Sequence, residues 1–553
     1  MTESNCSITG ADRVVKRIPT IALYAIEVAI LLAVLVAAWR ARTVWPSLPL
    51  PDGDTWGYLS PSLTWLSGEG FRQAEGRDWL YPAMVAFFLK STGSFAGILS
   101  WQRAFGFGSA ILMAATWRSF VALLPVGRWG RFFISLAGAI PIYVQLTNEQ
   151  NILYESSIRP EAVLPFFVYA QLGCVVLYCR YRWQKPRALP ALLVGAASIL
   201  LAYACMVLKP SWYFAFGTTS LPVLFGLFGK GLPLRTRWLT PVFGGLAALG
   251  LVWLPGKLLL IRDGASRTLL PDALFCVHAQ LIERLFTERC AQLADADPQK
   301  AKLQALLKVM GSEIQVAANV PNVYEKLRID PDYLMHSPVF SKAIYDYAGD
   351  DRGKFSAFCF ASYADAVLHY PWAYTQKVWT QFAYFLFPDP KSFVRDHLSI
   401  GKYYREGSEF LQVEWGDGLR PDWRDRYRSY HRATVELAHT AGSLENTPKL
   451  REIRDSYAEC AFVMESLFLL ALLAAYWWPP LHDMRIGGWA AGFLFLAPLG
   501  NALGVCIVHA LDIYRYRATL GGYLLFALTA MAAYVVAVTV CGLQRYLAVR
   551  KRA

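Results

Sequence analysis

The chain has 553 residues, of which 55% are hydrophobic and 17% charged, and its mean hydropathy is +0.31. Soluble domains contain nearer ~25% charged residues, so this composition, with its repeated long apolar runs, excludes an ordinary soluble protein and predicts a polytopic membrane protein. The net charge of +13 does not indicate nucleic-acid binding, because the basic residues do not cluster on one soluble face and many of them lie in short gaps between apolar runs.

In chain order, the apolar runs predict about ten transmembrane helices, seven of them before a long polar region. The predicted spans are Ile18–Ala38, Ile98–Trp117, Phe132–Leu146, Ala162–Tyr178, Ala188–Leu208, Trp212–Phe228, Leu239–Leu260, Ala461–Trp478, Gly487–His509 and Leu520–Leu543. The first run is long for a cleaved signal peptide and is interpreted as a retained helix. The expected fold is an all-α membrane protein with a module at 1–260, a mostly helical extracytoplasmic domain at 261–459 and C-terminal helices at 460–553.

The charges of the short loops predict the orientation. If ten spans alternate, the basic loops all fall on one side, which the positive-inside rule makes cytoplasmic. These basic residues are Arg13, Lys16, Arg17, Arg118, Arg128, Arg131, Arg180, Arg182, Lys185, Arg187, Lys230, Arg235, Arg237, Arg485, Arg545, Arg550, Lys551 and Arg552. Both termini are then cytoplasmic. The first outer loop (41–97) and the polar region face the outside of a bacterial inner membrane, which is the periplasm where an outer membrane is present.

The polar region carries two features of its own. Ala301–Val320 interleaves apolar and polar residues as an amphipathic helix does. His369–Pro388 is rich in Trp, Tyr and Phe and poor in charge, which indicates a helix in the membrane interface or, alternatively, a short re-entrant helix. An oxidising compartment would permit disulfides among Cys276, Cys290, Cys359 and Cys460, but the spacing leaves their pairing open.

Four short segments place charges at the outer mouths of predicted helices. The first is Pro51–Ser60 with Asp52 and Asp54, continuing to Arg77 and Tyr81. The others hold Glu155, Arg159 and Glu161; Lys209; and Arg515 with Arg517. Carboxylates beside a bilayer are unfavourable unless they are solvated or used, so this face is where chemistry is expected.

Acids and bases on the outer face suit glycosyl transfer from a lipid-linked donor. Nucleotide sugars are cytoplasmic, so an outer enzyme needs a sugar carried by a lipid phosphate. A carboxylate would take the proton of the acceptor hydroxyl, and cations would hold the departing phosphate. The anomeric carbon would pass through an oxocarbenium-like state.

Two stretches resemble the GT-C superfamily of membrane glycosyltransferases, with protein O-mannosyltransferases and lipid A aminoarabinose transferases the most similar in pattern. They are DTWGYL (Asp54–Leu59) and RDWLYPAMVAFFLKSTG (Arg77–Gly93); RPEAVLPFFVYA (Arg159–Ala170) resembles the second outer loop of that superfamily. The resemblance implies a polyprenyl-phosphate sugar donor, a catalytic acid in the first outer loop and a first module of seven helices. Thr55 follows Asp54 where many members carry a second acid, so a divalent cation stays an open alternative.

These arguments give a set of candidate residues. Asp54 is the expected general base and Glu161 a second catalytic acid; Arg77, Arg159, Lys209, Arg515 and Arg517 are expected to bind phosphate or substrate, and Trp56, Tyr58 and Tyr81 to line the sugar pocket. Several of these residues have a plainer alternative: loop solvation for the aspartates, helix capping for Glu161, snorkelling for Lys209 and topology anchoring for Arg515 and Arg517. Asp52 is expected to be a helper or a surface group.

The expected partners are a polyprenyl-phosphate-linked sugar, an envelope lipid, glycan or protein acceptor, and membrane lipids, without nucleic acid. No CxxC or HExxH motif supports a zinc site. Two other functions stay open. One is a flippase or transporter of lipid-linked glycans, and the other is a glycan polymerase or ligase with a pyrophosphate-linked donor.

Overall fold

The computed structural model describes most of the chain. The described residues are 20–74, 76–228, 231–263, 269–320, 324, 327–386, 397–441, 443–445, 460–510 and 514–551. They are almost entirely helical, apart from a two-stranded antiparallel ribbon of β1 (His397–Ser399) and β2 (Ser443–Glu445), in which His397 pairs with Glu445.

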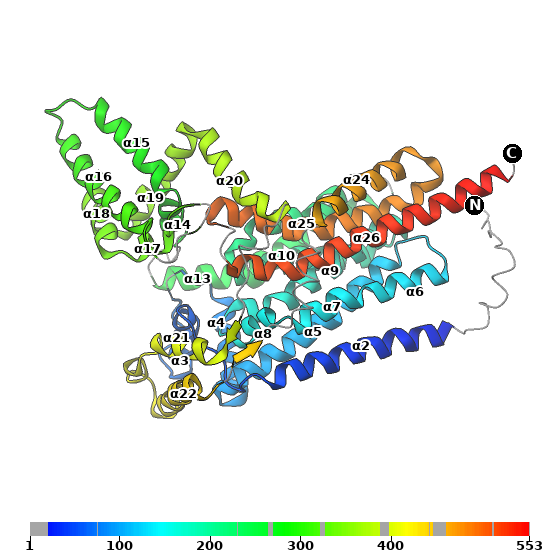
Figure 1. Cartoon of the computed structure of the whole chain (residues 1–553), viewed down its shortest axis with the longest axis horizontal. Coiled ribbons are helices and arrows are strands. Elements are labelled where there is room, and N and C mark those ends of the chain that lie inside the picture. The colour runs from blue at the N-terminus through cyan, green and yellow to red at the C-terminus, as the bar shows by residue number, and fades with distance from the viewer. Residues whose placement is uncertain are drawn as a thin grey trace.

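Long apolar helices form a bundle that fills most of Figure 1. Its helices are α2 (Thr20–Thr43), α5 (Phe95–Val121), α6 (Arg128–Ala137), α7 (Ala139–Thr147), α9 (Leu164–Cys179), α10 (Ala188–Leu208), α11 (Tyr213–Phe225), α12 (Leu234–Ala248), α13 (Leu254–Asp263), α24 (Ala461–Trp477), α25 (Arg485–Val508) and α26 (Tyr514–Arg550). Within the described residues, six helical stretches are long and apolar enough to cross a membrane. They confirm the prediction of an all-helical multi-pass membrane protein.

Four of the ten predicted spans have a different form. α5 is bent by 115° from α4 (Leu80–Thr92), and the two together make a seventh candidate span. The third predicted span divides into α6 and α7 at Gly138, where Pro141 removes a backbone donor and the indole of Trp117 takes the space of a side chain. α11 has 13 residues and α24 has 17. The number ten is therefore still a prediction.

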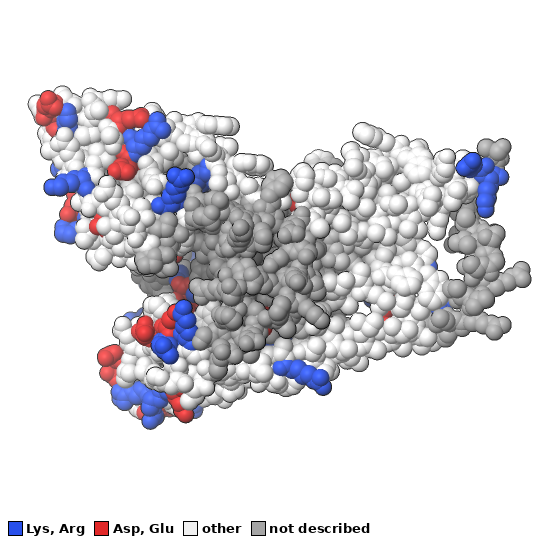
Figure 2. All heavy atoms as spheres, viewed as in Figure 1, with Lys and Arg blue, Asp and Glu red and all other residues white. Residues whose placement is uncertain are grey.

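The two ends of the bundle differ. α2 begins and α26 ends at one end, and we call the opposite end the distal end (Figure 1). The distal end carries α3 (Thr55–Leu66), α4, α8 (Glu149–Ser156) and the short 3-10 helices η1 (Pro160–Ala162) and η3 (Pro210–Trp212). Charged side chains gather there and near the C-terminal end, while the bundle surface between them is largely uncharged (Figure 2).

Most of the described residues of the polar region (261–459) form two lobes at the distal end (Figure 1). The α16 lobe consists of α14 (Leu270–Val277), α15 (Ala279–Gln292), α16 (Pro298–Ala317), α17 (Pro331–His336), α18 (Pro338–Ala348) and α19 (Arg352–His369). It has its own core, to which Phe275, Met310 and Phe340 belong. Cys276, Cys290 and Cys359 are buried there as free thiols, and Cys460 is an exposed one.

The α22 lobe consists of α21 (Ile400–Glu409), η6 (Val413–Gly416) and α22 (Pro421–Thr440). It has no separate core of its own among the described residues. Trp423, Tyr427 and Tyr430 belong to the same apolar core as Leu59 of α3 and the bundle helices. α20 (Pro371–Leu386) follows the α16 lobe and lies against α25.

Candidate functional site

The acidic loop before α3 is fixed by its own hydrogen bonds. The backbone N–H of Asp54 donates to Asp52 Oδ1 at 2.8 Å, and the N–H of Asp52 donates to the hydroxyl of Thr55 at 2.8 Å. Such local bonds from Asp and Thr side chains favour a turn over continued helix, so α3 begins at Thr55 with Asp54 at its N-cap position. The turn points both carboxylates out of the helix.

A backbone bridge holds this loop beside the segment that carries Arg159. Leu50 N–H donates to the carbonyl of Ser156 at 2.7 Å, and Ile158 N–H donates to the carbonyl of Leu50 at 3.1 Å. Residues about a hundred positions apart in the sequence are thereby brought into register. The arginine next to this bridge, Arg159, reaches the acidic loop.

Asp54 lies between two arginines. Arg77 Nη2 donates to Asp54 Oδ1 at 2.5 Å, and Arg159 Nη2 lies 3.4 Å from Asp54 Oδ2. Arg159 Nε also donates to Asp52 Oδ2. The four side chains are between 14% and 27% exposed, so this is a partly buried cluster of two acids and two bases that opens to solvent.

Gly57 allows Arg77 to reach this position. A Cβ at residue 57 would lie 3.0 Å from Cγ of Arg77, closer than ordinary van der Waals contact. The guanidinium then lies over the ring of Tyr58, 5.3 Å from its centroid, where the electron-rich face attracts it. The YL part of the sequence motif thus positions the arginine beside Asp54.

A second ion pair, Lys209 with Glu161, is more deeply buried. Lys209 Nζ lies 2.9 Å from Glu161 Oε1, and the two side chains are 7% and 5% exposed. Lys209 ends α10 in an extended conformation that the following Pro210 favours, and Glu161 lies in η1, a few residues after the Leu50 bridge. Lys209 Nζ also lies 5.3 Å from the ring of Tyr516 near the start of α26.

Two tyrosines lie between the clusters. The rings of Tyr58 and Tyr81 meet edge to face with centroids 5.2 Å apart, and Gln102 Nε2 donates to the Tyr81 hydroxyl at 2.8 Å. Burial raises the pKa of Tyr58, Arg77 lowers it, and the carboxylates of Asp54 and Glu161 raise it. Burial is the largest of these causes, so the pKa of Tyr58 is raised. Its ring contacts Arg77 of the acidic cluster on one side and Tyr81 on another.

The other candidate residues are placed differently. Trp56 stacks on Trp415 of η6 at 4.1 Å between centroids, so its ring packs under the α22 lobe. Tyr81 is 1% exposed and is a packing residue. Arg515 and Arg517 lie in the first turn of α26, and their side chains are outside the described residues.

The α22 lobe covers the acidic loop, which the sequence did not indicate. Tyr430 Oη donates to the carbonyl of Pro49 at 3.0 Å, and Tyr404 Oη donates to that of Leu48 at 2.5 Å. Phe410 lies beside Gly53. No pattern in residues 400–440 signals these contacts, because each is a single side chain meeting a backbone carbonyl far away in the sequence.

A buried ion pair was also missed as a candidate. Both nitrogens Nε and Nη2 of Arg42 donate to the carboxylate of Glu155, at 2.7 and 2.6 Å, with side chains 3% and 8% exposed. Gly106 makes room for it, since a Cβ there would lie 2.2 Å from Glu155 Oε2. The available signal in the sequence was that Arg42 and Glu155 are charged residues that each follow a predicted apolar span.

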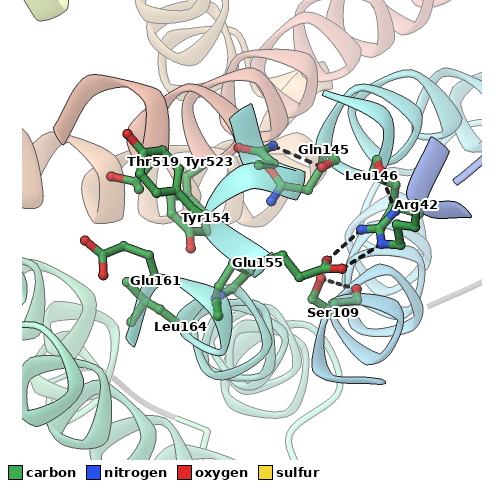
Figure 3. Close-up of a pocket in the computed structure, with 14 residues that line it drawn as sticks. Arg42, Ser109, Gln145, Leu146, Tyr154, Glu155, Glu161, Leu164, Thr519 and Tyr523 are labelled. Atoms are coloured by element: carbon green, nitrogen blue, oxygen red, sulfur yellow. Dashed lines mark hydrogen bonds and ion pairs between the residues drawn. The ribbon is translucent and has the colours of Figure 1, made fainter. Parts of the chain in front are cut away.

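Figure 3 shows a narrow polar pocket that connects this pair to Glu161. Arg42, Glu155 and Ser109 lie at one side, Glu161 lies at the other, and Tyr154, Thr519 and Tyr523 lie between or above them. Its lining combines carboxylates, amides and hydroxyls with the apolar side chains of Leu146, Leu164 and Pro165, and the polar part suits water or a hydroxylated ligand group. Glu161 therefore belongs both to the pocket and to the Lys209 pair.

The described residues contain no group of three His, Cys, Asp or Glu side chains that converge as metal ligands. Asp52 and Asp54 each accept a bond from arginine instead. A cluster with guanidinium groups on both sides of a carboxylate suits an anionic ligand that can exchange places with the carboxylate.

Comparisons with protein-family models, with curated proteins and with solved structures found no match to this chain.

Proposed function

We propose that this protein is a membrane glycosyltransferase that moves a sugar from a polyprenyl-phosphate donor to an extracytoplasmic acceptor. The observation that carries the proposal is the position of Asp54 between Arg77 and Arg159 at the distal end of an apolar bundle. The reaction needs a carboxylate and phosphate-binding cations within reach of one another, beside a membrane.

We interpret the state in which Asp54 is paired with Arg77 and Arg159 as a resting state. Each oxygen of Asp54 lies beside an arginine, so the two ion pairs compete with an acceptor hydroxyl for the carboxylate. A donor phosphate would attract Arg77 and Arg159 through paired, charge-assisted hydrogen bonds and would release Asp54. Donor binding would thus switch on the base.

The proposed reaction is a single displacement. The acceptor oxygen forms a bond to the anomeric carbon while the bond from that carbon to the phosphate oxygen breaks. The acceptor proton passes to Asp54, and the electron pair leaves with the polyprenyl phosphate. Arg77 and Arg159 stabilise the charge that builds on this leaving group.

Other residues are assigned supporting roles. Lys209 would share the phosphate charge, and Glu161, which faces the polar pocket, would hold a sugar or acceptor hydroxyl. Arg515 and Arg517 are proposed as further phosphate ligands, since Tyr516 between them lies near Lys209. The α16 lobe is proposed to help select the acceptor lipid, glycan or protein.

The proposal includes ten membrane crossings with both termini in the cytoplasm. α2 begins and α26 ends at the same end of the bundle, as an even number of crossings requires. The basic short loops favour the cytoplasm for that end. The distal end would then face the outside of a bacterial inner membrane, where polyprenyl-phosphate sugars are used.

The test is Asp54→Asn in sealed right-side-out vesicles supplied from outside with a radiolabelled, short-chain polyprenyl-phosphate sugar. Loss of a general base is expected to lower the transfer rate by about 100-fold or more. Asp425→Asn is the matched control, because Asp425 is an exposed acid of the α22 lobe. Transfer at the wild-type rate by the Asp54 variant would contradict the proposal.

The same vesicles distinguish the alternatives. Donor that crosses the membrane without forming a covalent product would favour a flippase or transporter. A product lengthened by whole oligosaccharide units, made only from a pyrophosphate-linked donor, would favour a polymerase or ligase.

A further inference from the structure

α20 joins the α16 lobe to the distal end of the bundle (Figure 1). Its inner face carries Phe385, which is 4% exposed and shares an apolar cluster with Val505 of α25 and Leu520 of α26. Val378 and Phe382 pack against the same cluster. α20 is therefore held against the distal ends of α25 and α26, two helices that are long and apolar enough to span a membrane.

Lys377 fixes this attachment. Its Nζ donates to the carbonyl oxygens of Cys506 and His509 at 2.6 and 2.7 Å. These carbonyls end α25, where the helix dipole is negative and backbone acceptors lack helical partners. The single cation of α20 thus points inward, at the bundle.

The outer face of α20 is uncharged and carries two exposed indole rings. Trp372 is 78% exposed and Trp379, seven residues later on the same face, is 56% exposed. Leu368, near the end of α19, is 79% exposed, and the neighbouring His369, which lies near Glu288, is exposed as well. The other exposed side chains of the described part of α20 are uncharged, namely Pro371, Thr375, Gln376 and Thr380.

α22 differs from α20 in this respect, although α20 is not alone at the distal end in exposing an indole, since Trp65 of α3 is 41% exposed. α22 exposes Asp422, Asp425, Arg426 and Arg428, as a water-facing helix does. Both helices belong to the same polar region of the chain. Of these two helices, only α20 presents indole rings to its surroundings.

We propose that the outer face of α20 lies in the lipid interface, with Trp372 and Trp379 among the headgroups and upper acyl chains of the leaflet at the distal end. Tryptophan favours this zone because one part of the indole is apolar and its N–H is polar. The buried cluster around Phe385 fixes α20 beside two helices that are long and apolar enough to span a membrane. The outer face has no basic residue, so contact does not require anionic lipid.

This inference is independent of the proposed enzymatic function. Its consequence is that the α16 lobe is held close to the membrane surface at one side, since α20 follows α19 directly. An acceptor or any other ligand of that lobe would then meet it within reach of the bilayer.

The test is photo-labelling of the full chain in phosphatidylcholine nanodiscs that contain a phosphatidylcholine with a diazirine near the glycerol end of one acyl chain. Mass spectrometry of peptides locates the adducts. Lipid adducts on Trp372 and Trp379 are expected at about fivefold or more above those on Val316, which is 41% exposed on α16. Trp477, which is 78% exposed at the end of α24, is the positive control.

Two variations sharpen the result. The double variant Trp372→Ser, Trp379→Ser should lose most labelling on residues 368–380 while Trp477 keeps its own, because both changed side chains are exposed and their loss does not disturb the core. Replacing half of the phosphatidylcholine by phosphatidylglycerol should leave labelling within about twofold, in the absence of a basic outer face.

Labelling of α20 at the level of Val316, with Trp477 labelled, would overturn the proposal. So would protection of the same face from both the lipid probe and hydroxyl radicals in water, because that result would indicate a protein partner or a second copy of the chain as the occupant.

Discussion

The two lobes at the distal end come from one segment of the chain, but they are stabilised in different ways. The α16 lobe packs around its own core. Among the described residues, Ala510 is the one buried member of that core that lies outside the lobe. The α22 lobe places Trp423, Tyr427 and Tyr430 in the core of the bundle and of α3. The first lobe is an attached unit, whereas the second is part of the wall around Asp54.

This difference leads to different expectations for mutations in the two lobes. A change in the core of the α22 lobe should alter the acidic loop and any activity at Asp54. A change in the core of the α16 lobe should destabilise that lobe while the acidic loop stays intact. Core packing transmits strain only where side chains are in contact.

The largest effect is expected for Tyr430→Ala in α22. Tyr430 is 3% exposed, its ring stacks on Phe95 at 4.4 Å between centroids, and its hydroxyl holds the carbonyl of Pro49. Removing a buried aromatic ring costs about 3–5 kcal/mol, and here it also frees the residues before Asp52. Hydrogen exchange at residues 48–54 should rise and sugar transfer should fall.

Met310→Ala is the matched change in the α16 lobe. Met310 is fully buried in that core, so the loss should be about 2–5 kcal/mol and of similar size. Exchange should rise in α15 and α16, with little change at residues 48–54. Equal loss of transfer activity in the two variants, with equal exchange at the acidic loop, would contradict the comparison.

A smaller effect is expected for Gly407→Ala in α21. A Cβ at residue 407 would lie 2.2 Å from the carbonyl oxygen of Pro51, so the backbone before Asp52 must move. Overpacking of this kind costs about 1–3 kcal/mol. The transfer rate should fall, and hydrogen exchange at residues 48–54 should rise.

Gly418→Ala in the same lobe is the control, since a Cβ there would meet nothing within 4 Å. Both changes remove one glycine and add one methyl group. An unchanged transfer rate for Gly407→Ala would show that the position of Pro51 does not matter to Asp54.

Much of the bundle was predictable from the sequence, because apolar length is a local property. Each of the six long spans overlaps a predicted one; seven of their twelve ends were predicted to within three residues, and the other five differ by five to eight. Breaks within apolar runs were harder: Gly138 and Pro141 were visible, but whether a helix bends there depends on what packs against it, here Trp117.

The candidate site was predictable in part. Asp54, Arg77 and Arg159 were all named from charges at helix mouths, and they are in contact in the structure. Their meeting depends on the backbone bridge at Leu50, which has no sequence signature. The Arg42–Glu155 pair and the cover provided by the α22 lobe depend in the same way on long-range contacts.

The smallest predicted effect is a loss of stability of the α16 lobe at low pH, measured against the α22 lobe. His278 lies between α14 and α15 and is 4% exposed. Burial, with the charge of Lys377 adding to it, lowers the pKa of His278 from its usual 6.5 to about 3. Nδ1 lies 2.8 Å from the carbonyl of Leu274, which fits a neutral ring with its proton on Nδ1, and Nε2 is buried without a hydrogen-bond partner among the described residues.

The direction of the pH dependence follows from the lowered pKa of His278. The unfolded lobe binds a proton below about pH 6.5, whereas the folded lobe stays neutral down to about pH 3, so acid favours unfolding. The free energy of unfolding of the α16 lobe, as far as His278 determines it, should be at its maximum above about pH 7. It should fall by about 1.4 kcal/mol between pH 7.5 and 5.5. Hydrogen exchange in α15, corrected for the intrinsic rate at each pH, measures this loss against the α22 lobe in the same sample. His278→Gln should flatten the dependence, because Gln keeps a donor for Leu274 but does not titrate; an equally steep dependence in that variant would assign the effect to another group.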